Sequence, residues 1–273
     1  MSDLYRELGA GFGGSAPGYD CEAEGNPAMA YMRRVSLGTL QATFAPGERV
    51  LELGCGTGEE ALALGRAGVR VLATDLSADM LAVAGRKIVD AGLEQVVQTR
   101  RLAAGEIAAL VQELGKGAFD GAYSSFGALN GEPELEEVGR ALAALVRPGG
   151  CLVVSVMNRF YPFEVFWFLA HGRPREAVRR WGGSAMAHVS PSLAVRVRTW
   201  YRTPGECARA FSDFRRVSCQ ALPLLFPPPY AAHLWARFPA WMERLARWEE
   251  RLAGRKPFCS LGDHFLMVLE RER

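Results

Sequence analysis

The chain has 273 residues, 49% hydrophobic and 23% charged, a composition that excludes intrinsic disorder and collagen-like or low-complexity structure. The formal net charge of +2 conceals a division along the chain: residues 1–150 hold 13 Lys and Arg against 20 Asp and Glu, whereas residues 151–273 hold 19 against 10. All six Trp lie in the second part. We therefore expect an acidic, Trp-free front and a basic, Trp-rich back.

The first residues show no basic segment followed by an apolar one, and no run of about 18 apolar residues occurs. The six Cys form no C-x-x-C pair, and the four His are widely spaced. These patterns predict reduced cysteines, a cytoplasmic location, no membrane span and no metal site.

Residues 1–48 are interpreted as a segment that precedes the main fold. It is rich in glycine between Gly9 and Gly18, and one amphipathic helix is predicted over 27–43. A regular alternation of strands and helices follows. Short apolar runs predict strands at 49–53, 69–74, 96–102, 119–124 and 151–157. Apolar spacing and end signals predict helices at 58–67, 79–91, 105–114 and 133–146, with Ser77 as an N-cap and residues 148–150 as a turn. Five strands alternating with helices indicate a parallel sheet covered on both faces.

After Met157 the alternation stops. Residues 158–181 are aromatic and helix-like, and residues 185–202 suggest a hairpin. A short helix opening at Thr203-Pro204, a strand over 214–222, a Trp- and Arg-rich helical stretch over 230–252 and a last strand over 263–270 complete the chain.

The most specific motif is a glycine loop, Gly54-Cys55-Gly56-Thr57-Gly58, at the end of the first strand of the alternation. Glycines at a strand-to-helix junction let the backbone approach a ligand closely, and Asp75 ends the next strand, where a carboxylate can accept hydrogen bonds from a ribose diol. The spacing G-x-G-x-G differs from the dinucleotide fingerprint G-x-G-x-x-G. Glu52, just before the glycines, would repel a pyrophosphate and suit a cationic ligand.

The segment 50–58, together with Asp75, Phe119-Asp120 and the stretch 145–150, resembles class I S-adenosylmethionine-dependent methyltransferases, and more narrowly the small-molecule branch that includes ubiquinone, menaquinone and natural-product methylases. The resemblance covers residues 15–157 and returns more weakly near 203–222 and 262–270. It implies an α/β fold with a Rossmann-like, doubly wound, seven-stranded sheet whose last strand is antiparallel. The whole chain, 1–273, would be one methyltransferase domain, with a cofactor-binding core at about 40–157, 203–222 and 262–271 and a cap formed by insertions 158–202 and 223–261.

The resemblance also implies roles for residues around S-adenosylmethionine. The glycine loop, with Gly54, Cys55, Gly56 and Gly58, would line its methionine part, Asp75 would hold the ribose and Leu76 would pack on adenine. Ser124, Ser125 and Phe126 would close over the cofactor. The family often has an acidic residue after the third strand that reads the adenine amine, but in this chain Ala103 or Ala104 stands there. Glu106 would substitute for it, or backbone groups would hold adenine, with Ala104 and Gly105 as candidate cofactor contacts. Tyr19 resembles part of the N-terminal segment that folds over the cofactor, and Arg33 is a candidate partner for the methionine carboxylate, with a solvated helix Arg as the plainer alternative.

Methyl transfer needs alignment above all, and a base only when the acceptor loses a proton. Asn130, after the fourth strand, is a candidate to orient an acceptor oxygen or to cap the next helix. His264, beside Asp263, is a candidate base or a structural histidine.

The insertions supply candidate acceptor contacts at Tyr161, Trp167, Trp200 and Tyr230, although an aromatic stripe is also typical of core packing. Interleaved arginines would suit an anionic acceptor: Arg173, Arg175, Arg179, Arg180, Arg196 and Arg198. We therefore predict methyl transfer to an O, N or C nucleophile of a small hydrophobic or aromatic acceptor, with no metal and no nucleic-acid partner.

Three alternatives stay open. The basic, aromatic back would also suit an RNA or tRNA methyltransferase, although no recognised RNA-binding module is present. The chain would alternatively be a non-catalytic S-adenosylmethionine-binding protein, or a nicotinamide-dependent reductase.

Overall fold

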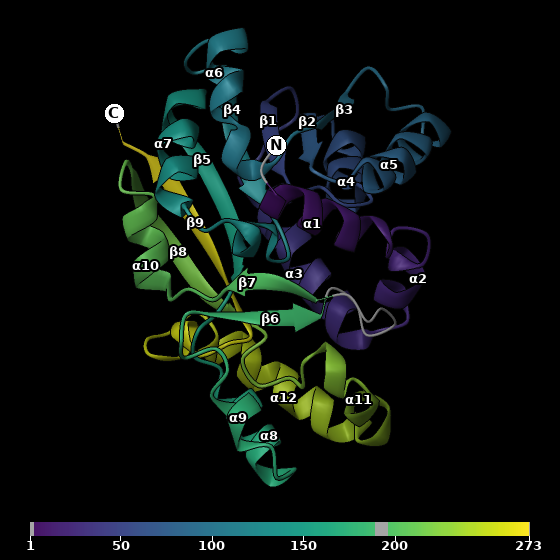
Figure 1. Ribbon diagram of the computed structural model, residues 1–273, viewed down its shortest axis with the longest axis vertical. Coiled ribbons are helices and arrows are strands. Elements are labelled where there is room, and N and C mark those ends of the chain that lie inside the picture. Colours follow the sequence, from purple (N-terminus) through teal and green to yellow (C-terminus); the bar gives the residue numbers. More distant parts are fainter. Residues whose placement is uncertain (1–2, 189–195, 273) are drawn as a thin grey trace.

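The computed structural model describes residues 3–188 and 196–272. Its centre is a seven-stranded sheet in the order β3-β2-β1-β4-β5-β9-β8 (Figure 1). The strands are β1 (Arg49–Leu53), β2 (Arg70–Asp75), β3 (Val97–Arg101), β4 (Phe119–Ser124), β5 (Val146–Met157), β8 (Phe214–Leu222) and β9 (His264–Arg271). Strands β1 to β5 are parallel, and β9 pairs antiparallel with both β5 and β8. The predicted doubly wound α/β class and the antiparallel last strand are confirmed.

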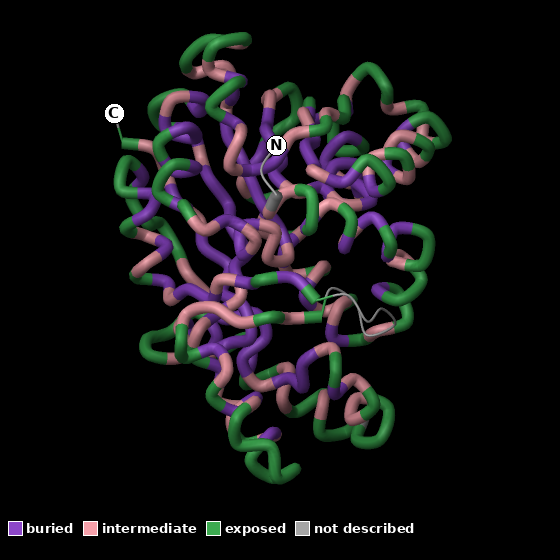
Figure 2. The backbone as a smooth tube through the Cα atoms, viewed as in Figure 1, coloured by how far each residue is buried: buried purple, intermediate pink, exposed green. Residues whose placement is uncertain are grey.

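Two layers of helices bury the sheet. The helices of the chain are α1 (Asp3–Gly13), α2 (Tyr19–Glu24), α3 (Pro27–Thr43), α4 (Glu59–Arg66), α5 (Ala78–Asp90), α6 (Ala108–Leu114), α7 (Leu135–Leu145), α8 (Pro162–Ala170), α9 (Pro174–Ala177), α10 (Pro204–Ala210), α11 (His233–Arg237) and α12 (Pro239–Leu252). One core cluster joins α6, α7 and α10 to the sheet, and a second joins α3, α4 and α5 to it. Figure 2 shows the buried strands inside and exposed turns outside.

Local signals explain several boundaries. Asn26 caps α3 by accepting from Ala28 N (3.1 Å), and Pro27 at the first helical position has no N–H to satisfy. The Ser77 hydroxyl accepts from Met80 N (3.3 Å) at the start of α5, as predicted. Thr203 and Glu206 form a reciprocal capping box at α10.

Three sequence expectations are corrected. The segment 1–48, for which a single helix over 27–43 was predicted, also contains the helices α1 and α2. The predicted turn at 148–150 lies within β5, where the pairing with β4 shifts register between Phe119 and Gly121. The stretch 230–252 is interrupted, with a short 3-10 turn at Pro229–Ala231 before α11 and α12.

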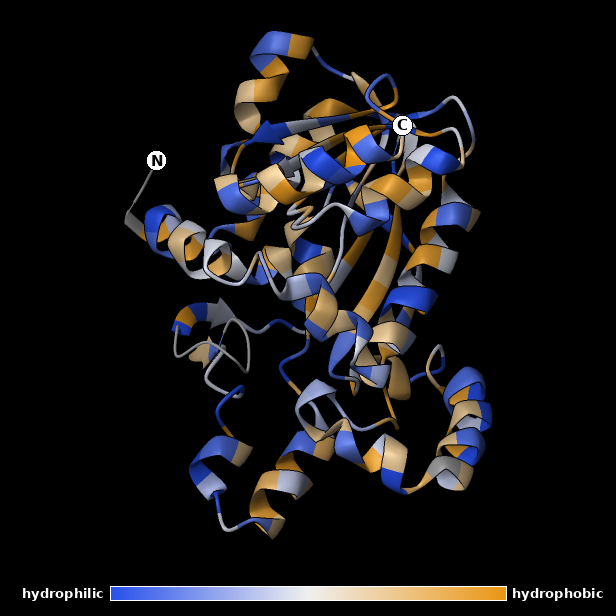
Figure 3. Cartoon of the chain, turned by 90° about the vertical axis from the view of Figure 1, so that its right-hand side faces the viewer, coloured by the Kyte–Doolittle hydropathy of each residue, from blue (hydrophilic) through white to orange (hydrophobic). Residues whose placement is uncertain are grey.

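Two strands stand outside the main sheet: β6 (Ser184–His188) and β7 (Arg196–Trp200) form an antiparallel pair, as the hairpin prediction requires. Helices α8, α9, α11 and α12 lie at the far end of the molecule from α6 (Figures 1 and 3). Within the described ranges, no helix is both long and apolar enough to cross a bilayer.

The edge of the sheet where the parallel strands end collects the candidate site. Because β9 runs antiparallel to β5, with His264 opposite Met157, the first residue of β9 reaches the same edge as the last residues of β1, β2, β4 and β5. In an open parallel sheet this is the edge where ligands bind.

Candidate active site

The glycine loop after β1 has a left-handed backbone at three positions: φ is +71° at Gly54, +52° at Gly56 and +82° at Gly58. A Cβ at Gly54 would overlap the Ala128 side chain, whereas a Cβ at Gly56 would meet no atom within 4 Å. The loop is therefore packed at one end and open beside the Gly56 backbone, which is the space a ligand needs to approach it. The Cys55 side chain is buried, and burial raises the pKa of its thiol well above the usual range.

Asp75, at the end of β2, is bound to this loop. Its Oδ2 accepts from Gly56 N (2.9 Å), and its Oδ1 accepts from Ser77 N (2.8 Å). Each carboxylate oxygen retains a further lone pair, so the group can still accept from a diol. Burial raises the pKa of Asp75, and the backbone N–H donors oppose that rise.

Buried acidic groups lie behind the loop. Glu52 is 1% exposed, and its Oε2 and the Tyr123 hydroxyl have no hydrogen-bond partner among the described residues. Burial, together with the nearby Glu60 and Asp75 carboxylates, raises the pKa of Glu52 well above its usual range. Burial therefore disfavours the charged form of Glu52 when no cation lies beside it, and its suitability for a cationic ligand stays a prediction.

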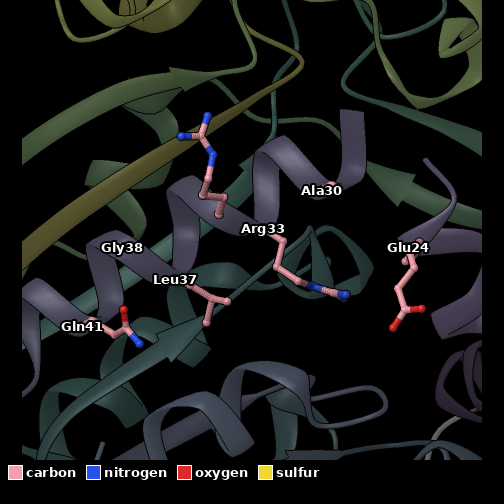
Figure 4. Close-up of a pocket in the computed structure, with 8 residues that line it drawn as sticks. Glu24, Ala30, Arg33, Leu37, Gly38 and Gln41 are labelled. Atoms are coloured by element: carbon pink, nitrogen blue, oxygen red, sulfur yellow. The ribbon is translucent and has the colours of Figure 1, made fainter. Parts of the chain in front are cut away.

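Arg33 extends from α3 over this region. Its Nε donates to Glu60 Oε1 (3.2 Å), and its guanidinium lies 5.7 Å from the centre of the Phe126 ring. It also lines a groove of about 560 Å³ between α2 and α3, where Figure 4 shows it pointing away from the helix toward the side on which Glu24 lies. Glu60 already compensates the charge of Arg33. The methionine carboxylate, which is the predicted partner of Arg33, would therefore have to share this guanidinium with Glu60.

Helices α1 and α2 lie over the strand ends. The Thr57 hydroxyl donates to Asp20 Oδ1 (2.6 Å), and Lys87 Nζ lies 2.5 Å from Asp20 Oδ2. Tyr19 is the first residue of α2. Burial and the nearby Glu60 carboxylate raise the pKa of its hydroxyl, whereas the charge of Arg33 lowers it. Asp20 thus joins α2 to the glycine loop, and the folding of Tyr19 and its neighbours over the cofactor stays a prediction.

The predicted adenine end lies under α1. A Cβ at Gly9 would lie 2.9 Å from Leu76 Cδ1, so α1 packs closely against the Leu76 side chain at this glycine. The Tyr5 hydroxyl donates to Glu132 Oε2 (2.7 Å) and reaches the backbone at Gly105, beside the buried Ala104. Tyr5 and Glu132 were missed from the sequence because 127 residues separate them.

The loop after β4 is strained. Phe126 has φ +52° and is the one non-glycine residue with positive φ among the described residues, and Gly127 follows at +79°. The Ser124 hydroxyl donates to Leu53 O (2.9 Å), and the Ser125 and Ser36 hydroxyls lie 3.3 Å apart. Backbone strain of this kind costs about 1 to 3 kcal/mol and is found mainly at functional sites.

The family model described as "Methyltransferase domain" matches residues 50–150, which run from the middle of β1 into β5. The part of the chain from residue 50 to residue 150 therefore matches a methyltransferase domain. The methyl donor of this family is S-adenosylmethionine.

The curated relatives are small-molecule methyltransferases. A ubiquinone biosynthesis O-methyltransferase of Xanthomonas campestris pv. campestris (strain B100) is 33% identical over 117 residues, 42% of this chain and 45% of that protein. A demethylmenaquinone methyltransferase of Beutenbergia cavernae is 34% identical over 137 residues, 50% of this chain and 51% of that protein. The chain thus matches about half the length of these relatives.

Solved structures extend the likeness of the fold. An S-adenosylmethionine-dependent methyltransferase from Mesorhizobium loti aligns with a TM-score of 0.58 and 21% identity over 88% of this chain and 98% of its own. A geranyl diphosphate C-methyltransferase from Streptomyces coelicolor aligns with a TM-score of 0.54 and 15% identity over 87% and 78%. At these identities the alignments show a shared fold.

The pairing of β9 with β5 places His264 at the strand-end edge. Its Nδ1 lies 3.1 Å from Asp263 Oδ2, and its Nε2 lies 3.5 Å from the position that a Cβ would take at Gly127. A carboxylate on Nδ1 favours the tautomer that leaves Nε2 as an acceptor. That acceptor faces the strained loop of the domain.

Asp263 is itself held by Arg180, which is 3% exposed. Arg180 donates to Asp263 Oδ1 (2.7 Å) and to both oxygens of Glu164 (2.9 and 2.6 Å). Arg180 and His264 together hold the pKa of Asp263 well below its usual range, against the effect of burial. Arg179 also binds Glu164, and the exposed Arg173 pairs with Glu176 on the surface, so each of these three arginines already has a carboxylate partner.

Asn130 has a different environment from the predicted one. It is 2% exposed; its Nδ2 donates to Met157 O (3.2 Å) and Trp200 O (2.5 Å), and its Oδ1 accepts from Met157 N (2.8 Å). The amide is occupied by backbone groups, which corrects the expectation of a free group for an acceptor. It ties β5 to β7 instead.

The four aromatic residues predicted to contact the acceptor are not brought together as one set. Tyr161, Phe163 and Trp167 stack in sequence, with ring centres 5.9 and 6.0 Å apart. The buried Tyr161 hydroxyl donates to Phe226 O (3.1 Å), and the Tyr230 hydroxyl lies 3.4 Å from Glu164 Oε2. Trp200 lies apart from them in β7, with its carbonyl bound by Asn130. No group of three or more potential metal ligands occurs among residues 3–188 and 196–272.

Proposed function

We propose that this chain transfers a methyl group from S-adenosylmethionine to an O, N or C nucleophile of a small hydrophobic or aromatic acceptor. The observation that carries this proposal is the glycine loop, open beside Gly56 and hydrogen-bonded to Asp75, within a methyltransferase domain. When bound, the cofactor would supply a methyl group attached to its sulfonium sulfur. The acceptor nucleophile would attack the methyl carbon in line with the carbon–sulfur bond, and S-adenosylhomocysteine would leave.

The residues of this chain fit that cofactor. The Gly54–Gly58 backbone offers the close approach that the methionine part needs, and Asp75 retains acceptors for the ribose hydroxyls. We assign Leu76, Ala104 and Gly105 to the adenine end. The unpartnered Glu52 Oε2 is a ready acceptor for a cationic group, which would lower the pKa of that carboxyl by charge attraction.

For an acceptor that loses a proton, such as a phenol, we assign the proton to His264 Nε2. Asp263 orients the ring through Nδ1 and stabilises the positive charge that the ring gains. General-base catalysis of this kind contributes about 10² to 10⁴ in rate. The closed cover of α1 and α2 would keep water from the site.

The chemistry of the acceptor is proposed from the cap, which we define as residues 158–202 and 223–261. Several of its arginines are paired with carboxylates, so we take its aromatic residues as the candidate acceptor contacts, including the Tyr161–Phe163–Trp167 stack, in which Tyr161 is buried. Aromatic lining favours a hydrophobic acceptor. Quinone precursors are the acceptor class that the names of the curated relatives suggest.

The test joins binding to turnover. Titration calorimetry with S-adenosylmethionine and S-adenosylhomocysteine should show binding by the full chain. Release of S-adenosylhomocysteine should then occur with prenylated hydroquinones or catechols, assayed beside aromatic carboxylates and tRNA. Binding without turnover on any acceptor would favour a non-catalytic binding protein, and turnover on tRNA alone would overturn the small-molecule acceptor.

A further inference from the structure

Helix α12 presents two indole rings to solvent. Trp241 is 61% exposed and Trp248 is 54% exposed, and they alternate with the exposed Arg244 and Arg251. The spacing 241, 244, 248, 251 places all four on one face of the helix. Large exposed aromatic residues grouped on one face mark an interaction surface rather than ordinary scatter.

Each ring on this face has a cation beside it. The Arg244 guanidinium lies 5.9 Å from the centre of the Trp241 ring, and Arg251 lies 5.8 Å from that of Trp248. At the start of the helix, Arg237 lies 5.5 Å from the centre of the Phe238 ring, which is 42% exposed. An aromatic ring beside a cation is favourable at a boundary between an apolar and a polar phase, because the ring can enter the apolar phase while the cation stays in the polar one.

The opposite face of α12 is fixed to the protein. Glu249 is fully buried and accepts from Leu224 N (2.6 Å) and Leu225 N (2.7 Å). These two bonds set the rotation of the helix, so that its Trp and Arg face is turned outward. Figures 1 and 3 show α12 at the end of the molecule away from α6.

We propose that this face of α12 binds the surface of a lipid bilayer that contains anionic lipids. The exposed charged residues of 237–256 are mostly basic, with Arg237, Arg244, Arg247, Arg251, Arg255 and Lys256 against Glu243 and Glu250. Their charge complements anionic headgroups, while the rings enter the headgroup boundary. A convex helix face also fits a flat bilayer better than single-stranded RNA, which is bound in grooves. The inference does not depend on methyl transfer, but it would bring the domain to the phase where a hydrophobic acceptor dissolves.

Vesicle co-sedimentation tests it. The full chain should sediment with vesicles of phosphatidylcholine mixed with phosphatidylglycerol, bind more weakly to phosphatidylcholine alone, and be released by added salt. The variants Trp241→Ala/Trp248→Ala and Arg244→Glu/Arg251→Glu should each weaken binding by about tenfold or more. A matched control, Trp181→Ala/Arg216→Glu, removes an exposed Trp and an exposed Arg on other elements and should bind as the unchanged chain does.

Circular dichroism and S-adenosylhomocysteine affinity should be unchanged in the α12 variants, which separates this surface from folding and from the proposed function. Brominated lipids should quench tryptophan fluorescence in the unchanged chain and lose that effect in Trp241→Ala/Trp248→Ala. Equal loss of sedimentation in the control, binding of tRNA without vesicles, or a dimer that the α12 variants dissociate in light scattering would each overturn the proposal.

Discussion

The Asp75 carboxylate and the Gly56 backbone N–H are joined by a hydrogen bond of 2.9 Å, which locks the end of β2 to the loop after β1. Gly56 is also the loop position with open space beside it. One residue therefore holds the loop in shape and borders the place where the cofactor is proposed to bind.

Gly56→Ala should fold and lose cofactor affinity. An Ala at φ +52° costs about 1 to 2 kcal/mol of stability, and its methyl group would occupy the open space. Calorimetry should show S-adenosylhomocysteine affinity weakened by about tenfold or more, equivalent to about 1.4 kcal/mol. Gly47→Ala is the matched control, since φ is +90° there and no atom lies within 4 Å. Equal affinity in the two variants would show that the open space is not the binding site.

Much of the sheet could be predicted because its signals are local. The bounds of β1, β4 and β8 were predicted without error, since each strand is a short segment between turn or cap signals, and Ser77 marks the start of α5. The glycine loop and Asp75 were found for the same reason: each follows directly after a predicted strand. Their mutual hydrogen bond crosses only 19 residues.

The rest depends on distant contacts. The glycines between residues 9 and 18 gave no helix signal, but residues 3–13 form α1, in which Gly9 and Gly13 lie close to Leu76 and Asp79, so tertiary packing overrides local propensity. The arginines of the cap suggested an anionic ligand, yet Arg180 finds Glu164 and Asp263, the latter 83 residues away. No spacing rule in the sequence reveals such a partner.

Glu52→Gln should raise stability at neutral pH and weaken cofactor binding. Burial raises the pKa of Glu52 in the folded chain, so its stabilising contribution is present below its unfolded pKa and is lost as pH rises through the folded one. The amide of the variant does not titrate and has no such loss. The melting temperature of the variant should therefore exceed that of the unchanged chain by a margin that grows from about pH 5 upward.

The control for this experiment is Glu94→Gln, a substitution on the exposed surface. The difference in melting temperature between this control and the unchanged chain should not grow across the same pH range. Calorimetry at neutral pH should show S-adenosylmethionine affinity reduced by about tenfold in Glu52→Gln, because a neutral amide replaces the proposed acceptor of a cationic group. A margin that does not change with pH would mean that Glu52 is not held neutral by the fold.

His264→Gln should lower kcat by about 10² to 10⁴ with acceptors that lose a proton, because Nε2 is the proposed proton acceptor. S-adenosylhomocysteine affinity and KM should change little, since no binding contact is assigned to this ring. His171→Gln, at an exposed histidine that directly follows α8, is the comparison variant and should keep full turnover. Steady-state kinetics with the best acceptor found would measure both variants. An unchanged kcat in His264→Gln would show that His264 is not the general base.

Arg180→Met should cost about 3 to 5 kcal/mol of unfolding free energy, because it leaves the buried Glu164 and Asp263 carboxylates short of their cation. Urea unfolding measures this. Arg173→Met breaks an exposed pair with Glu176 and should cost at most about 1 kcal/mol. The depressed pKa of Asp263 adds a pH signature: the stability it contributes is present above its unfolded pKa and is lost as pH falls through the folded one, so the deficit of Arg180→Met should shrink in acid below about pH 4. The triple variant Arg180→Met/Glu164→Gln/Asp263→Asn should recover part of the loss. A deficit that is the same at every pH, or no greater than that of Arg173→Met, would mean that this network does not stabilise the region around His264.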